Sequence, residues 1–189
     1  MKNRNVLPFL IILLTGVIYF AVQAQQKNGT HSTNFFGEWK SKESISMGGN
    51  IVCCYNPGDR MLSKTMKIAE QANFLTIESS SSFPGTAQVT RQEKLAFDGK
   101  ESQIDYGPDR GKKFTVKWSA DGQTMTINSI VHLMVATPYK VNEMEQMVVN
   151  VTEVWSLSND GKSIVVQASA ESNSLGEVRS WKTVFDKAD

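Results

Sequence analysis

The chain has 189 residues, of which 20 are basic and 19 acidic, so its formal net charge is +1. This balance argues against nucleic acid and against an acidic membrane surface as partners, because both favour a strongly basic face. The only two cysteines, Cys53 and Cys54, are adjacent, which excludes an ordinary framework of intramolecular disulfides.

The N-terminal residues 1–24 have the pattern of a cleavable signal peptide. Lys2 and Arg4 form a basic start, an apolar run extends over residues 6–22, and short side chains precede a cut after Ala24. The alternative is an uncleaved membrane anchor, since the run is at the short edge of the roughly 17–25 residues that span a bilayer. No cysteine lies near the cut, which argues against a lipid anchor.

Cleavage after Ala24 predicts an exported protein, periplasmic or extracellular, that keeps no membrane-inserted segment. It removes two of the 20 basic residues and none of the 19 acidic ones, so the mature net charge is −1. The mature chain of about 165 residues fits one domain with a sizeable core. We expect residues 25–34 to be a flexible polar lead-in and residues 35–189 to be the folded domain.

The folded part alternates apolar and polar residues between turns that contain glycine. Asp-Gly pairs at 98–99, 121–122 and 160–161 separate such runs, and this is a strong hairpin signal because glycine accepts the positive φ of the turn. Residues 143–147 are compatible with a short helix. The pattern predicts strands over residues 36–43, 63–70, 73–80, 87–97, 101–107, 112–119, 123–133, 147–157, 163–171 and 177–186.

Successive strands joined by short turns predict an all-β, up-and-down meander. A meander of this length avoids exposed edges by closing into a barrel, here of about 8–10 strands. The segments that follow Trp118 and Trp155 resemble each other, because each passes from a tryptophan through serine to an Asp-Gly turn. Two similar hairpins explain this likeness, and nothing recurs at the fixed period of a repeat protein.

A set of short motifs resembles a known family. Gly37-Glu38-Trp39 opens the first strand, and Gly-x-Trp at this place resembles the lipocalin signature. The region 37–187 also resembles small secreted lipocalin-like proteins of Bacteroidetes-type bacteria, through GEWK at 37–40, FDGK at 97–100, KWS at 117–119, VWSL at 154–157 and VFDK at 184–187.

The resemblance implies a lipocalin-like barrel in which Trp39 is a structural plug at the closed end. It also implies that a small, mostly apolar molecule binds inside the barrel. The chain departs from ordinary lipocalins in having more strands and no evident C-terminal helix.

The sequence motifs of common enzymes are missing. The chain has no His-Glu-x-x-His, no Gly-x-Ser-x-Gly and no phosphate-binding glycine loop. Its two histidines, His31 and His132, are distant in sequence and do not suggest a metal site. His132 ends an alternating strand and fits a barrel rim better than a catalytic base. We therefore expect no catalytic residue, no metal and no cofactor.

Alternation predicts which side chains face the barrel interior. Charged residues share the predicted inner face with apolar ones, and buried charges are costly unless they are paired or hydrogen-bonded. Two interpretations stay open: an inner polar patch in which an arginine orients a ligand carboxylate, or charges at a rim and in internal ion pairs. The charged residues are Arg91, Glu93, Glu153 and Arg179. The candidate ligand-binding residues are Arg91, Tyr106, Trp118, Glu153, Trp155, Arg179 and Trp181.

Cys53 and Cys54 lie in a turn-rich stretch, residues 46–60, after the first predicted strand. If the Trp39 end of the barrel is closed, this loop lies at the open end. Adjacent cysteines close only a small, strained ring, or pair with other molecules. A vicinal disulfide that stiffens the loop and a pair of free thiols are both compatible with the sequence.

Three classes of function follow from these features. The first is an exported protein that binds a small apolar or amphipathic molecule in its barrel. The second is a packed barrel that binds another protein through its surface or its Cys53 loop. The third is an isomerase or cyclase that uses Glu153 or Tyr106 with Arg179, for which fold alone gives no support. An internal cavity of a few hundred Å³ favours the first class, and an ionisable pair with a strongly shifted pKa favours the third.

Overall fold

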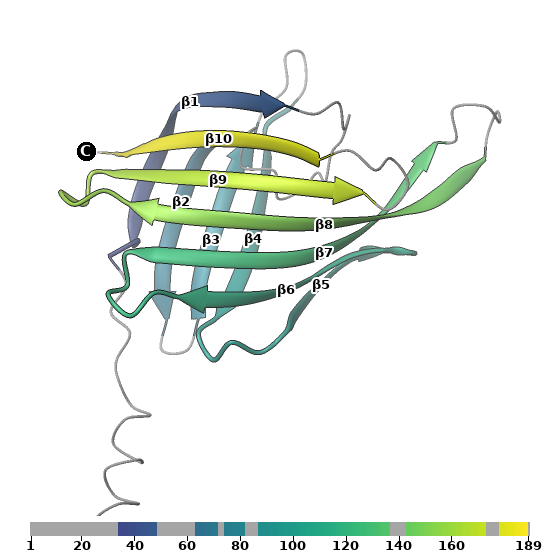
Figure 1. The fold of residues 1–189 in the computed structure, drawn as a ribbon, viewed down its shortest axis with the longest axis horizontal. Helices are drawn as coiled ribbons and strands as arrows, with labels where there is room; N and C mark the ends of the chain where they lie inside the picture. Colours follow the sequence, from purple (N-terminus) through teal and green to yellow (C-terminus); the bar gives the residue numbers. More distant parts are fainter. Residues whose placement is uncertain are drawn as a thin grey trace, which may run out of the picture. The chain divides into compact units, whose positions relative to one another are not determined.

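The structure, a computed structural model, describes residues 34–48, 63–71, 74–81, 87–136, 143–172 and 178–188. These residues form ten antiparallel strands and contain no helix, which confirms the predicted all-β class (Figure 1). The strands are β1 (Gly37–Gly48), β2 (Ser63–Gln71), β3 (Phe74–Ser81), β4 (Val89–Ala96), β5 (Ser102–Gly107), β6 (Arg110–Trp118), β7 (Thr124–Ala136), β8 (Met144–Leu157), β9 (Ser163–Ser172) and β10 (Val178–Lys187).

The strands form one sheet in the order β4-β3-β2-β1-β10-β9-β8-β7-β6-β5. Strands that follow each other in the sequence pair with each other, apart from β4 and β5, which are the two ends of the sheet. In addition, β1 pairs with β10. The sheet curls into a nearly closed up-and-down barrel, as the meander predicted (Figure 1). Residues 102–118 form the β5–β6 hairpin, and the junction between β4 and this hairpin is called the seam.

Two differences from the predicted boundaries have one physical cause, the presence of a pairing partner. Strand β1 was expected to end at residue 43, but its ladder with β10 continues to Gly48, with irregularities after Ser41 and Ser46. The short helix considered for residues 143–147 is wrong, because Met144 pairs with Ala136 and the β7–β8 ladder runs from there without a break. A helix of five residues gains too little to offset its nucleation, whereas a strand beside a long partner gains a full ladder.

The β6–β7 and β8–β9 turns have the same hydrogen bonds. Ser119 Oγ donates to Asp121 Oδ1 over 2.5 Å, and Ser158 Oγ donates to Asp160 Oδ1 over 2.6 Å. Each carboxylate also accepts a backbone N–H two residues later. These bonds favour the ionised form and hold the pKa of both aspartates below its usual value.

The turn geometry corrects the correspondence between the two hairpins. Because Ser119 is equivalent to Ser158, the counterpart of Trp118 is Leu157 and not Trp155. The likeness therefore comes from the shared Ser-x-Asp-Gly turn, and the two tryptophans occupy different positions in the barrel.

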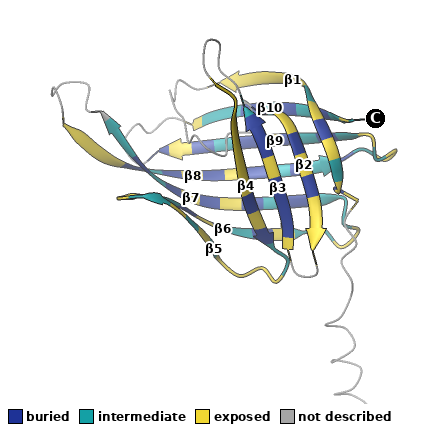
Figure 2. Cartoon of the chain, turned by 180° about the vertical axis from the view of Figure 1, so that it is seen from behind, coloured by how far each residue is buried: buried dark blue, intermediate teal, exposed yellow. Residues whose placement is uncertain are grey.

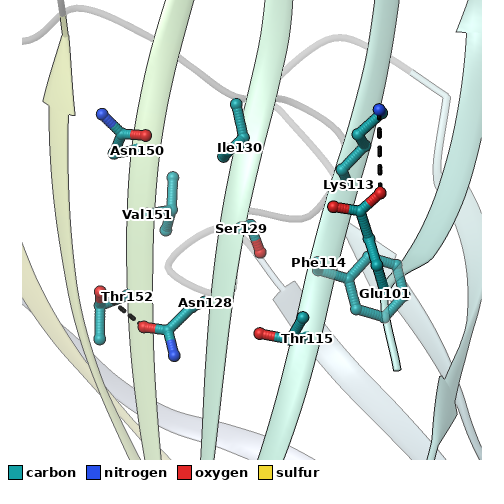
Figure 3. Close-up of a pocket in the computed structure, with 10 residues that line it drawn as sticks. All are labelled: Glu101, Lys113, Phe114, Thr115, Asn128, Ser129, Ile130, Asn150, Val151 and Thr152. Atoms are coloured by element: carbon teal, nitrogen blue, oxygen red, sulfur yellow. Dashed lines mark hydrogen bonds and ion pairs between the residues drawn. The ribbon is translucent and has the colours of Figure 1, made fainter. Parts of the chain in front are cut away.

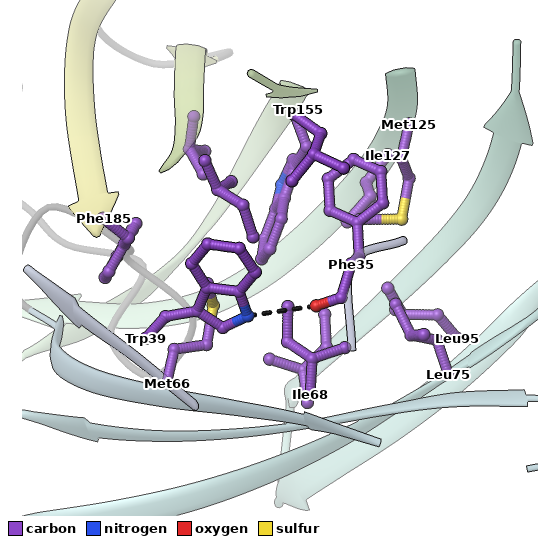
Figure 4. Close-up of a cluster of buried hydrophobic side chains, with 14 of the residues drawn as sticks. Phe35, Trp39, Met66, Ile68, Leu75, Leu95, Met125, Ile127, Trp155 and Phe185 are labelled. Carbon is purple, nitrogen blue, oxygen red and sulfur yellow. Dashed lines mark hydrogen bonds between the residues drawn. The ribbon is translucent and has the colours of Figure 1, made fainter. Parts of the chain in front are cut away.

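A first apolar cluster fills the end of the barrel that contains Trp39 and the Asp-Gly turns, called the Trp39 end (Figure 4). Trp39 is 1% exposed, and its indole N–H donates to the carbonyl oxygen of Phe35 over 3.0 Å. The Phe35 ring meets the Trp118 ring edge-on, with centroids 5.7 Å apart. The buried members are Phe35, Trp39, Met66, Ile68, Leu75, Ile77, Leu95, Phe114, Val116, Met125, Ile127, Trp155, Leu157, Ile164, Val166 and Phe185.

Gly37 has a structural reason to precede the plug. Its φ of 133° lies in a region that side chains rarely adopt, and a Cβ there would lie 3.0 Å from Cε of Lys187. Lys187 in turn places its ammonium group 5.5 Å from the centroid of the Trp39 ring. The Gly-x-Trp motif is thus accounted for by backbone conformation and packing at this end.

A second apolar cluster covers the inner face of β7–β10 toward the opposite end, called the far end. Its members are less than a tenth exposed, and they alternate with outward residues along each strand (Figure 2). The buried members are Val131, Leu133, Met147, Val149, Val151, Ala168, Ala170 and Trp181.

Candidate functional site

The interior places a carboxylate between the two apolar clusters. Glu153 lies on the inner face of β8, between Val151 of the second cluster and Trp155 of the first, and it is 0% exposed. Its Oε2 accepts a hydrogen bond from Nε1 of Trp155 over 2.9 Å. A buried carboxylate is tolerated only with such partners. Trp155 therefore has two roles: its ring packs in the first cluster and its indole N–H donates to Glu153.

A buried ion pair joins β4 to β6. Nζ of Lys112 lies 3.1 Å from Oε1 of Glu93, and the two side chains are 2% and 3% exposed. The same ammonium group lies 5.3 Å from the ring centroid of Phe114. Each charge offsets the desolvation of the other. Removing only one of the two charged side chains therefore costs stability, because the remaining charge stays buried without its partner.

Lys112 was missed among the candidate residues, although a signal for it existed. It is in phase with Phe114 and Val116, so alternation places it on the inner face as well. Glu93 was placed on that face, and an internal ion pair was one of the two interpretations left open. The apolar alternation of this strand begins at Phe114, so the sequence alone does not single out Lys112 as the partner of Glu93.

Hydroxyl groups also line the interior. Ser129 lies on the inner face of β7, between Ile127 and Val131, and is 4% exposed. Among the described residues its hydroxyl has no hydrogen-bond partner. Thr183 on β10 is 0% exposed and accepts a hydrogen bond from Ser44 Oγ over 3.3 Å. The interior therefore presents neutral polar groups beside the apolar wall.

Arg179 and Trp181 come together on the inner face of β10. The guanidinium carbon of Arg179 lies 4.7 Å from the Trp181 ring centroid, within cation–π range. Trp181 is 0% exposed and belongs to the second cluster, whereas Arg179 is half-buried. Since β10 begins at Val178, this arginine marks the far end of the apolar wall.

The remaining candidates are scattered. Arg91 is exposed on β4, and Tyr106 is half-buried on β5. Trp118 is half-buried at the Trp39 end, where it contacts Phe35 and Phe97 edge-on. The structure thus brings Glu153 together with Trp155, and Arg179 together with Trp181.

Other predictions concern positions away from the barrel interior. Cys53 and Cys54 lie outside the described residues, as do His31 and the predicted signal peptide. His132 is half-buried on the outer face of β7, out of phase with the inward side chains. No group of three or more metal-binding side chains occurs among the described residues.

The outer surface carries a recess of about 280 Å³ over β6, β7 and β8 (Figure 3). Its side chains are mainly neutral and polar, and Thr152 Oγ1 donates to Oδ1 of Asn128 over 3.2 Å. At one edge Nζ of Lys113 lies 3.8 Å from Oε1 of Glu101. These polar side chains stand on the outer face of the strands and in large part in solvent, so the recess resembles an ordinary sheet surface more than a built site.

Comparison with protein-family models, with curated proteins and with solved structures finds no match to this chain. In the part of the chain that the structure describes, no helix is long and apolar enough to cross a membrane.

Proposed function

We propose that this is an exported, lipocalin-like binding protein that holds a small, mostly apolar or amphipathic molecule at the far end of its barrel. The observation that carries the proposal is the second apolar cluster. Its wall includes the small side chains of Ala168 and Ala170, 6% and 2% exposed, and ends at the half-buried guanidinium of Arg179. An apolar wall with few, placed polar groups is the usual character of a small-molecule site.

The contrast between the two ends supports this location. Large side chains such as Trp39, Phe35 and Phe185 occupy the Trp39 end. At the far end the inward residues of β9 include the small side chains of Ala168 and Ala170. Glu153 and Ser129 lie between this apolar wall and the cluster at the Trp39 end, and they would orient a hydroxyl or amine of the bound molecule.

Arg179 gives the proposal a prediction about ligand charge. A guanidinium forms short, charge-assisted hydrogen bonds with a carboxylate and has no such advantage with an alcohol. We therefore expect Arg179→Ala to weaken dodecanoate binding by about 10–100-fold, as for a hydrogen bond to a charged group worth about 1.5–3 kcal/mol, and dodecanol binding by much less. Equal losses for the two ligands in a fluorescence titration would exclude Arg179 as the carboxylate partner.

Native mass spectrometry of the protein purified gently from its own host tests the function itself. A mass above that of the bare chain, with a small molecule released on denaturation, supports a carrier and identifies its cargo. A native mass equal to that of the chain, with no released species, contradicts the proposal.

A matched pair of variants tests the location. Ala170→Leu enlarges a side chain on the inner wall, whereas Gln167→Leu makes the same kind of change on the exposed outer face of β9. We expect the first to abolish binding of the identified cargo and the second to leave it unchanged. Thermal unfolding of both variants separates lost binding from lost folding, because overpacking costs about 1–3 kcal/mol.

One observation favours a second candidate, a packed barrel that binds another protein. Trp39, Trp155 and Trp181 are each 1% exposed or less, so the barrel's own side chains occupy much of its interior. A cargo-free native mass, together with a lower Tm for Ala170→Leu than for Gln167→Leu, would favour this candidate over the carrier.

A further inference from the structure

The seam is the one junction of the described barrel that no backbone ladder crosses. Strands β4 and β5 are the two ends of the sheet, and each of the other described strands pairs on both sides. To separate any other pair of neighbours, the barrel must break a ladder such as the one between β7 and β8. At the seam no ladder of the described strands opposes separation, and side-chain contacts such as the Lys112–Glu93 pair hold the two edges together.

Burial along β4 shows where those contacts begin. The residues from Val89 to Gln92 are exposed on both faces of the strand, so side chains of the β5–β6 hairpin do not cover them (Figure 2). Glu93 is the first buried residue, and Leu95 follows it. Closure therefore starts at Glu93 and continues toward the Trp39 end, with the ion pair to Lys112 at its margin.

We propose that the seam is a lateral gate through which the ligand enters the barrel, and that the Lys112–Glu93 pair is its latch. The route of uptake rests on the proposed function, whereas the opening of the seam does not. Outward movement of β4 breaks no ladder with β5 or β6 and exposes the inner face near Phe114 and Ser129. This movement separates the two buried charges and uncovers Leu95, which is 0% exposed in the closed barrel.

Thiol labelling tests the opening. In a chain that carries Cys53→Ser and Cys54→Ser, a single thiol is introduced by Leu95→Cys, just inside the seam. The control is Val166→Cys on β9, between two complete ladders. Leu95 and Val166 are each 0% exposed, so a small maleimide reaches either thiol only when the barrel opens locally or globally.

The latch is then weakened by Lys112→Met. We expect labelling at position 95 to accelerate by about tenfold or more, which corresponds to about 1.4 kcal/mol, and to stay faster than labelling at position 166, which is reached through global unfolding. The combined change Lys112→Met with Glu93→Leu replaces the pair by apolar side chains and should restore slow labelling at position 95. Equal labelling rates at the two positions indicate that both thiols are reached by global unfolding and overturn the gate, as does an unchanged rate at position 95 in Lys112→Met.

Stopped-flow uptake tests the route, with dodecanoate as the probe and tryptophan fluorescence as the signal. A gate predicts that Lys112→Met raises the association and dissociation rates together, with a nearly constant Kd. A raised Kd with an unchanged association rate would make Lys112 a ligand contact and overturn the gate. If neither dodecanoate nor a cargo from the native protein binds, the proposed function and the uptake route both fail, and the labelling contrast alone decides whether the seam opens.

Discussion

The buried ion pair gives the most quantitative prediction about stability. Removing one partner by Lys112→Met leaves the carboxylate of Glu93 at 3% exposure without the ammonium group 3.1 Å away. Losing one partner of a buried pair costs about 3–5 kcal/mol, because the remaining charge keeps its desolvation penalty. For a domain of this size about 1 kcal/mol shifts the Tm by roughly 2–4 °C, so we expect a loss of about 6–20 °C.

The double variant separates the attraction within the pair from the cost of burying it. Replacing both residues, by Lys112→Met with Glu93→Leu, removes both charges and keeps apolar volume at the seam. Such replacements are often neutral or stabilising by about 1–4 kcal/mol. We therefore expect the double variant to be at least as stable as the parent, although one of its component changes is strongly destabilising.

Urea unfolding of the parent, both single variants and the double variant forms a complete double-mutant cycle. The cycle should yield a coupling of several kcal/mol between the two positions. Single variants that each cost less than about 1 kcal/mol would show that the pair behaves as an exposed one, and would refute the burial argument. A double variant as unstable as the worse single variant would show that the charges themselves are required.

Three further predictions follow from other parts of the molecule. Phe35→Ala should cost about 3–5 kcal/mol in urea unfolding, because the ring is 0% exposed among the plug residues; a cost below about 1 kcal/mol would show that the plug is dispensable. The lowered pKa of Asp121 and Asp160 means that their turns add stability above the ordinary aspartate pKa of 3.8, and that this stability is lost as pH falls through the lower folded values. Asp121→Asn with Asp160→Asn should therefore flatten the decline of Tm below about pH 4, and an unchanged slope would contradict the assignment. Edman sequencing of the native protein should begin at Gln25, whereas a chain that begins at Met1 would indicate an uncleaved anchor.

Local sequence patterns predicted most of the fold because each pattern has a local cause. Asp-Gly turns need a positive φ and inward residues need apolar side chains, so alternation located the ten strands and the meander. The extension of β1 to Gly48 was not predicted, because its serine-rich end is a strand only through its partner β10. The predicted strands 123–133 and 147–157 are shorter than β7 and β8 for a similar reason, because pairing between Met144 and Ala136 depends on a ladder and not on composition.

The interior was harder to predict than the strands. Alternation correctly put Glu93 and Glu153 among buried residues, but it put Arg91 on the same face, and Arg91 is exposed. The difference arises because β4 is an end of the sheet, and its residues from Val89 to Gln92 are exposed on both faces. Alternation alone does not tell which strand lies at the end of a sheet. Lys112 could be recognised as the partner of Glu93 only once that seam was known.

The distribution of polar groups gives a final argument about where function resides. At the Trp39 end the indole N–H of Trp39 donates to the backbone of Phe35, and the buried cluster around it is apolar. From Glu153 toward the far end, by contrast, the interior combines an apolar wall with the Ser129 hydroxyl and the Arg179 guanidinium. Burying such groups lowers stability unless they are used, and a packed barrel would be more stable with apolar residues in their place. The combination of an apolar wall with Ser129 and Arg179 beyond Glu153 therefore supports the proposal of a binding site at the far end.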